Sequence, residues 1–176
     1  MMPSGAIQAL SEFLQSAEVK LRVRAERLVP SAIYDLQYRM FVTAAAFEIH
    51  AKPLTPFGSR IHATRLKLLQ FVAIRPWLLP VIEEWSSSPD NEQGAFDAQE
   101  LRRGFLGDKT HDHVVAFLVA RGAFDWSGSH LLAGKRSDIL TDLSAFAREN
   151  ELFNSEREIL TALIKVRITN RMLEGS

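Results

Sequence analysis

The chain has no cysteine among its 176 residues. This absence excludes disulfide bonds, thiol nucleophiles and thiolate metal sites, and it fits a reducing compartment. Net charge is absent too, because 21 lysine and arginine side chains balance 21 aspartate and glutamate side chains. No overall field therefore draws the protein toward nucleic acid or anionic lipid, and any such binding must depend on local patches.

Long hydrophobic runs are also missing. The longest apolar stretches, such as MFVTAAAF, are far shorter than the ~20 residues of a membrane-spanning helix. The N-terminus lacks a basic region followed by an apolar run, so we expect a cytoplasmic protein that is neither exported nor inserted. The 47% hydrophobic and 24% charged fractions are typical of a globular protein with a sizeable core.

The spacing of apolar residues predicts a mainly α-helical fold. Apolar side chains recur three, four or seven positions apart over residues 6–28, which indicates an amphipathic helix. A second helix over 32–51 has apolar residues around most of its circumference, so we expect it to be the central core helix. After a loop with two prolines and a glycine, Ser59 should cap a third helix over 60–75, and a short fourth helix follows over 76–85.

The segment SSSPDNEQG at 86–94 has the composition of a loop or linker. We therefore divide the chain into an N-terminal helical region (1–85), a loop or linker (86–95) and a C-terminal region (96–176). One continuous domain that includes both regions is the alternative.

The C-terminal region is predicted to be winged helix-turn-helix-like, with one short β-hairpin. A short helix over 96–105 precedes a helix over 110–121, which should stop at Gly122 because glycine adopts the left-handed conformation that closes helices. Residues 123–126 and 130–134 are predicted to be strands, followed by helices over 137–150 and 155–173. This order of helices and hairpin is typical of winged helices, and a hairpin packed on a helical bundle is the alternative.

The charges of this region do not favour DNA reading. A recognition helix presents its N-terminal residues to the bases, yet Asp108 and Asp112 lie at that end and Arg121 lies at the other. The hairpin adds Lys135 and Arg136, enough for one or two phosphate contacts but fewer than the roughly six of a firm electrostatic grip.

A denser group of positive charge lies on the predicted third helix. No acidic residue occurs between positions 51 and 82. The helix holds five cationic or titratable side chains: Arg60, His62, Arg65, Lys67 and Arg75. They are suited to a nucleic-acid backbone or an acidic protein surface, or they form a solvated helix face with no partner.

Few residues indicate catalysis or metal binding. Four side chains of types that zinc, manganese or iron bind are clustered in sequence: Asp108, His111, Asp112 and His113. Ligands at i and i+2 suit a strand better than a helix start, and no second histidine cluster follows, so we favour a polar helix N-terminus, capped by Asp108 or Thr110, over a metal site. The chain has no Gly-x-Ser-x-Gly elbow, glycine-rich phosphate loop or dinucleotide fingerprint. We therefore expect a protein that is not an enzyme, with no catalytic residues, metal or cofactor.

Tryptophans are the remaining candidates for contact residues, because exposed tryptophan often anchors protein interfaces. Trp126 lies on the predicted hairpin, where it either packs the hairpin onto the core or meets a partner. The amphipathic helix over 6–28 is a second candidate, since it can dock in a partner's groove or pack within the chain.

Residues 38–85, which open with YRM and continue to RLKLLQFVAIRPWLLP, resemble the small middle components of bacterial three-component ABC-type (Lamassu-like) anti-phage defence systems. The resemblance implies a non-catalytic subunit that bridges an SMC-like ATPase and an effector nuclease. It carries no catalytic motif, so no site residues follow from it.

The leading hypothesis is therefore an adaptor subunit of a multiprotein complex. Its expected interaction surface consists of Arg60, Arg65, Lys67, Arg75, Trp126, Lys135 and Arg136. A DNA-binding winged-helix regulator is the alternative.

Overall fold

The computed structural model describes residues 35–53, 58–87 and 92–174, and the predicted helix over 6–28 lies outside these residues. The described chain is mainly helical, as predicted. Its α-helices are α3 (Leu36–His50), α4 (Ala63–Ala73), α5 (Leu79–Ser87), α6 (Glu92–Leu106), α7 (Lys109–Ala120), α8 (Asp138–Glu149), α9 (Asn154–Ala162) and α10 (Asn170–Glu174). Short 3-10 helices occur as η1 (Pro76–Leu78), η2 (Glu151–Phe153) and η3 (Leu163–Lys165).

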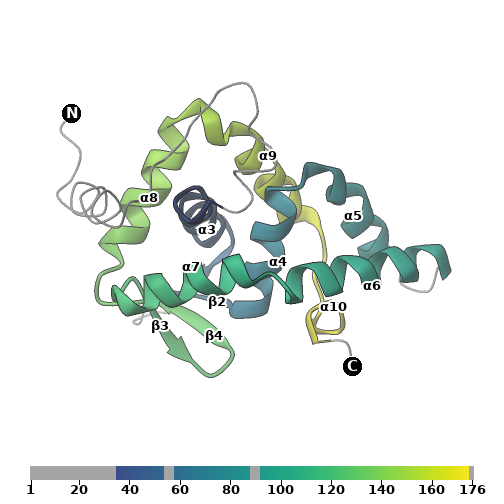
Figure 1. Cartoon of the computed structure of the whole chain (residues 1–176), viewed down its shortest axis with the longest axis horizontal. Coiled ribbons are helices and arrows are strands. Elements are labelled where there is room, and N and C mark those ends of the chain that lie inside the picture. The colour runs from purple at the N-terminus through teal and green to yellow at the C-terminus, as the bar shows by residue number, and fades with distance from the viewer. Residues whose placement is uncertain (1–34, 54–57, 88–91, 175–176) are drawn as a thin grey trace.

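Helix α3 forms the centre of the molecule. The Asp35 carboxylate caps it by accepting a hydrogen bond from the Tyr38 backbone N–H at 2.8 Å. Residues 39–47 are all buried, because α4, α7, α8 and α9 pack around the helix, as Figure 1 shows. The apolar residues around most of its circumference are thus covered by neighbouring helices.

A small antiparallel sheet lies beside the helices. Its strands are β1 (Lys52–Pro53), β2 (Ser59–His62), β3 (Phe124–Ser127) and β4 (His130–Ala133), in the order β1-β2-β4-β3. The predicted hairpin is confirmed as β3 and β4. Gly122 has a φ of 74° just after α7, so it provides the left-handed residue that the sequence indicates.

The prediction that Ser59 caps a helix beginning at residue 60 is wrong. Residues 59–62 form β2, and α4 begins only at Ala63, with His62 in the N-cap position. Ile61 enters the core while Arg60 and His62 lie on the opposite side of the strand, an alternation that suits a half-buried strand. The partner strand β4 comes from far along the chain, so local sequence gives no sign of it.

The helix predicted over 155–173 is also interrupted, because α9 ends at Ala162 and α10 starts at Asn170. The intervening residues include Val166, Ile168 and Thr169, whose β-branched side chains disfavour helix. Ser86 holds this stretch, since its hydroxyl accepts from the Arg167 N–H at 3.1 Å and donates to the Arg167 carbonyl at 3.2 Å.

The composition of residues 86–94 predicts a loop or linker, but the interval between the two flanking helices is shorter than this segment. Helix α5 continues to Ser87 and α6 starts at Glu92. Buried side chains from before and after this segment share one hydrophobic core. Within the described residues, no helix is long and apolar enough to cross a membrane.

Candidate functional site

The aspartate and histidine cluster lies at the start of α7, where it joins three helices. Asp108 is the cap, since its carboxylate accepts from the His111 backbone N–H at 3.2 Å, and Thr110 is not. The other Asp108 oxygen accepts a hydrogen bond from the guanidinium of Arg39 on α3. The Arg39 side chain is 0% exposed, so this ion pair is buried.

The His111 ring is buried and held by a polar network. Its Nδ1 lies 2.9 Å from the Gln70 side-chain oxygen on α4. Gln70 donates in turn to the Arg39 carbonyl at 2.9 Å and to the Thr43 hydroxyl. Burial, together with the charges of Arg39 and Lys67, lowers the pKa of His111 to about 3, so the ring is neutral at physiological pH.

The other two members of the cluster lie apart from this network. Asp112 accepts from Lys67 Nζ at 2.5 Å, and Lys67 also donates to the Leu106 carbonyl at 3.0 Å. His113 is exposed. Among the described residues, no three histidine or acidic side chains lie close enough together to hold a metal ion. The cluster is thus arranged as a helix cap and a buried connection between α3, α4 and α7.

The positive residues of the third predicted helix do not share one face. Arg60 and His62 lie on β2 instead, which corrects the prediction of five on one helix. Arg65 is half-buried, and burial lowers its pKa. Lys67 is engaged by Asp112, as described above. The guanidinium of Arg75 lies 3.8 Å from the centre of the Phe71 ring and donates to the Phe71 carbonyl at 3.2 Å.

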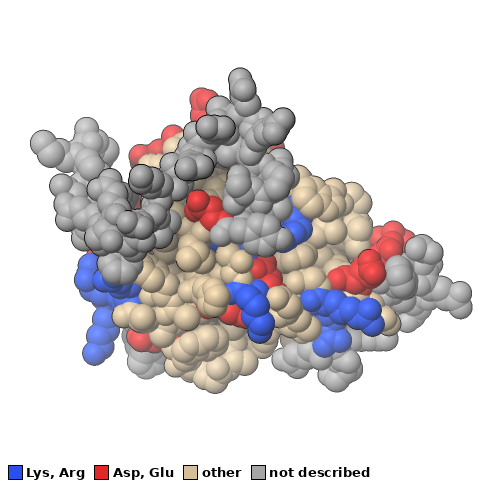
Figure 2. All heavy atoms as spheres, viewed as in Figure 1, with Lys and Arg blue, Asp and Glu red and all other residues tan. Residues whose placement is uncertain are grey.

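The lysine and arginine side chains at the surface do not form one continuous patch on the face that Figure 2 shows. Figure 2 shows lysine and arginine in separate groups on the visible face, with uncharged surface between them. Near the hairpin, Lys135 is exposed, and Arg136 pairs with Asp138 at 3.3 Å. A continuous basic surface of the kind that follows a phosphate backbone is not seen on this face.

The hairpin carries an exposed tryptophan. Phe124 and Trp126 lie on the same side of β3, opposite Ala133 and Leu131 of β4. Phe124 is completely buried, whereas Trp126, closer to the hairpin turn, remains 54% exposed. Trp126 therefore lies on the inward side of the strand, but beyond the area that the core covers.

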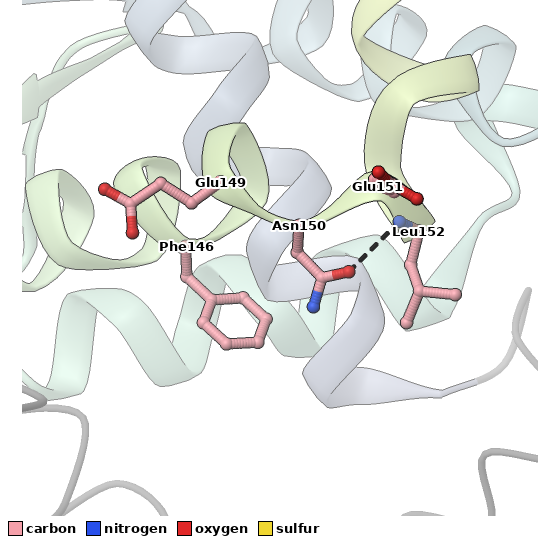
Figure 3. Close-up of a pocket in the computed structure, with 5 residues that line it drawn as sticks. All are labelled: Phe146, Glu149, Asn150, Glu151 and Leu152. Atoms are coloured by element: carbon pink, nitrogen blue, oxygen red, sulfur yellow. Dashed lines mark hydrogen bonds between the residues drawn. The ribbon is translucent and has the colours of Figure 1, made fainter.

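An open depression of about 650 Å³ lies where α8 meets η2. Its lining residues are Phe146, Glu149, Asn150, Glu151 and Leu152 (Figure 3). Asn150 shapes this junction, because its side-chain oxygen accepts from the Leu152 N–H at 3.0 Å. Beneath it, the Phe146 ring stacks on Phe41 with ring centres 4.6 Å apart.

Sequence reasoning did not find this depression. Phe146 and Leu152 are both partly exposed, and each has an acidic neighbour in the lining. The signal in the sequence is the run FARENELF, which places two acids between apolar residues at a helix end. Which of its apolar residues would be exposed depends on how η2 turns.

Comparison of the chain with protein families, with curated proteins and with solved structures finds no match.

Proposed function

We propose that this chain is a non-catalytic adaptor subunit that binds other proteins. The observation that carries the proposal is the 54% exposure of Trp126 on the hairpin. Tryptophan is enriched among the residues that dominate interface energies, because it buries a large area at low entropic cost. Several residues that DNA binding would need, Lys67 and Arg136 among them, are instead occupied by contacts within the chain.

We further propose that the adaptor uses a winged-helix-like scaffold. The arrangement that supports this is a hairpin directly after α7, with β2 pairing to β4 beside it and α3 and α4 packed against the same core. In this proposal α3, β2, α4, α7 and the hairpin form the winged unit, and residues 76–106 are inserted before its third helix.

The depression at the end of α8 is a second proposed contact surface. Phe146 and Leu152 provide its apolar part, and Glu149 and Glu151 provide negative charge. An amphipathic helix with lysine or arginine beside its apolar stripe complements both features.

The resemblance of residues 38–85 leads us to propose the partners. They are an SMC-like ATPase and an effector nuclease of an anti-phage defence complex, acting in the cytoplasm. The test is co-expression with the proteins encoded beside this chain, followed by size-exclusion chromatography. Elution of the chain in one complex with them supports the proposal. Elution as a monomer, with none of them retained, overturns it.

The two exposed tryptophans allow a matched test of the contact surface. Trp126 and Trp77 are 54% and 57% exposed, so their replacement should disturb folding equally little. Trp126→Ala is expected to weaken partner binding at least about 30-fold, the effect of an interface anchor, while Trp77→Ala leaves it within about threefold. The reverse result would move the interface to η1.

A DNA-binding regulator is the second candidate. The observation in its favour is that Arg60 and Lys135 are both exposed, one in the sheet and one after β4. Polarisation of a labelled duplex measures the binding, which should fall with rising salt and with Arg60→Ala and Lys135→Ala. Unchanged polarisation at low salt rejects this function.

A further inference from the structure

Two histidines face each other across the sheet, outside the network at α7. His62 of β2 and His130 of β4 are directly paired in the antiparallel register. Their side chains lie on the outer side of the sheet, because the adjacent residues Ile61 and Leu131 are buried on the inner side. The centres of the two imidazole rings are 5.2 Å apart, with the rings nearly perpendicular.

This ring separation is that of an edge-to-face aromatic contact, and it is also compatible with two histidines that share a metal ion. A zinc–nitrogen bond of about 2.0–2.1 Å places each ring centre about 3.2 Å from the metal. Two such ligands at a tetrahedral angle have ring centres about 5.2 Å apart. His62 and His130 are direct partners in the sheet, where Cβ atoms are about 4.5–5.5 Å apart, so rotation of the two side chains can bring a nitrogen of each ring to one ion.

The local chemistry also fits a metal ligand. The Ser129 hydroxyl lies 3.3 Å from His130 Nδ1. A contact at Nδ1 leaves Nε2 as the ligand atom and orients the ring, as outer contacts commonly do for metal-bound histidines.

We propose that His62 and His130 chelate one divalent transition-metal ion of the zinc class, with water in the remaining coordination positions. The proposal does not depend on the proposed adaptor function. A bound ion would link β2 to β4, and so stabilise the attachment of the hairpin to the sheet.

Three charged residues share this side of the sheet. In register, Arg60 pairs with Lys52 and with Leu132, and Leu132 pairs with Asp125. Arg60 and Lys52 repel a dication, whereas Asp125 attracts it. Arg60→Gln should therefore strengthen metal binding a few-fold, which a purely aromatic contact between the histidines would not predict.

The test is a titration of the chelator-treated full chain with zinc chloride, followed by long-range ¹H–¹⁵N NMR of the imidazole nitrogens. The chain has five histidines, so each can be followed separately. We expect the signals of His62 and His130 to shift together and to saturate at one equivalent of zinc. No shift of these two signals, or equal shifts of every exposed histidine, overturns the proposal.

Variants make the result specific. His62→Ala and His130→Ala should each reduce zinc affinity at least tenfold, because each removes half of the chelate. His113→Ala, which replaces an exposed histidine on α7, should leave the affinity unchanged. Zinc should also raise the melting temperature of the wild type but not of folded His130→Ala. Equal affinities in the wild type and both chelate variants would refute the site.

Discussion

Removing the charge of Asp108 should destabilise the fold strongly while leaving the helix cap in place. Asp108 both caps α7 and pairs with the completely buried Arg39. Asparagine caps helices about as well as aspartate does, so Asp108→Asn isolates the ion pair. Removing one partner of a buried ion pair typically costs about 3–5 kcal/mol. Asp108→Ala loses the cap as well, which adds about 1 kcal/mol.

Urea denaturation followed by circular dichroism measures these differences at pH 7. Asp138→Asn is the matched control, because Asp138 pairs with Arg136 at an exposed site. Its effect should be below about 1 kcal/mol. A loss below about 1 kcal/mol for Asp108→Asn, equal to that of the control, would refute the view that Arg39 depends on this partner.

The pH dependence gives an independent check of the same ion pair. Burial alone raises the pKa of Asp108, but the hydrogen bond and charge of Arg39 outweigh it and lower this pKa below its ordinary value. A lowered pKa means that the pair stabilises the fold fully above the ordinary aspartate pKa of about 4. The contribution is lost as the pH falls through the lower, folded-state pKa. The difference between wild type and Asp108→Asn should therefore shrink below about pH 4.

Two further predictions concern the same core and the hairpin. The pKa of His111 is about 3, so the unfolded chain takes up a proton from about pH 6.5 downward while the folded chain does not. Wild-type stability, measured by urea denaturation, should fall between pH 6.5 and 4.5. A His111→Gln variant whose stability falls equally steeply with pH over this range would contradict the prediction. An added Cβ at Gly134 would lie 2.3 Å from the Gly122 carbonyl oxygen, whereas at Gly128 it would meet open space. Gly134→Ala should therefore lower the melting temperature far more than Gly128→Asn, and equal shifts would show that the clash is relieved.

Local sequence was sufficient for several parts of the fold. The apolar residues around most of the circumference of 32–51 identified α3 as the core helix, because such a helix has to be covered on several sides. The glycine at 122 and the short apolar runs after it located the hairpin, because turn chemistry acts within a few residues. Asp108 was predicted as one of two possible caps, with Thr110 as the other, for the same reason.

Other features depended on residues distant in sequence. The strand at 59–62 exists because β4, about 70 positions later, offers free backbone groups to pair with. Because of this pairing, Arg60 and His62 lie on a strand and not on the predicted basic helix, and His62 lies opposite His130. The break after α9 reflects both β-branched residues and the contact with Ser86.

The sequence alone determined a charge-balanced, cysteine-free and mainly helical chain with a hairpin near residue 128. These properties follow from composition and from periodicity, which act over short distances. Only the tertiary structure decided which polar residues are used inside the fold. In the sequence alone, three residues have the side-chain types of a functional site: Asp108, His111 and Lys67. In the folded chain each of them contacts a polar side chain from another helix. The tertiary structure also decided that Trp126 stays exposed, because the core covers Phe124 but does not extend to the end of the hairpin.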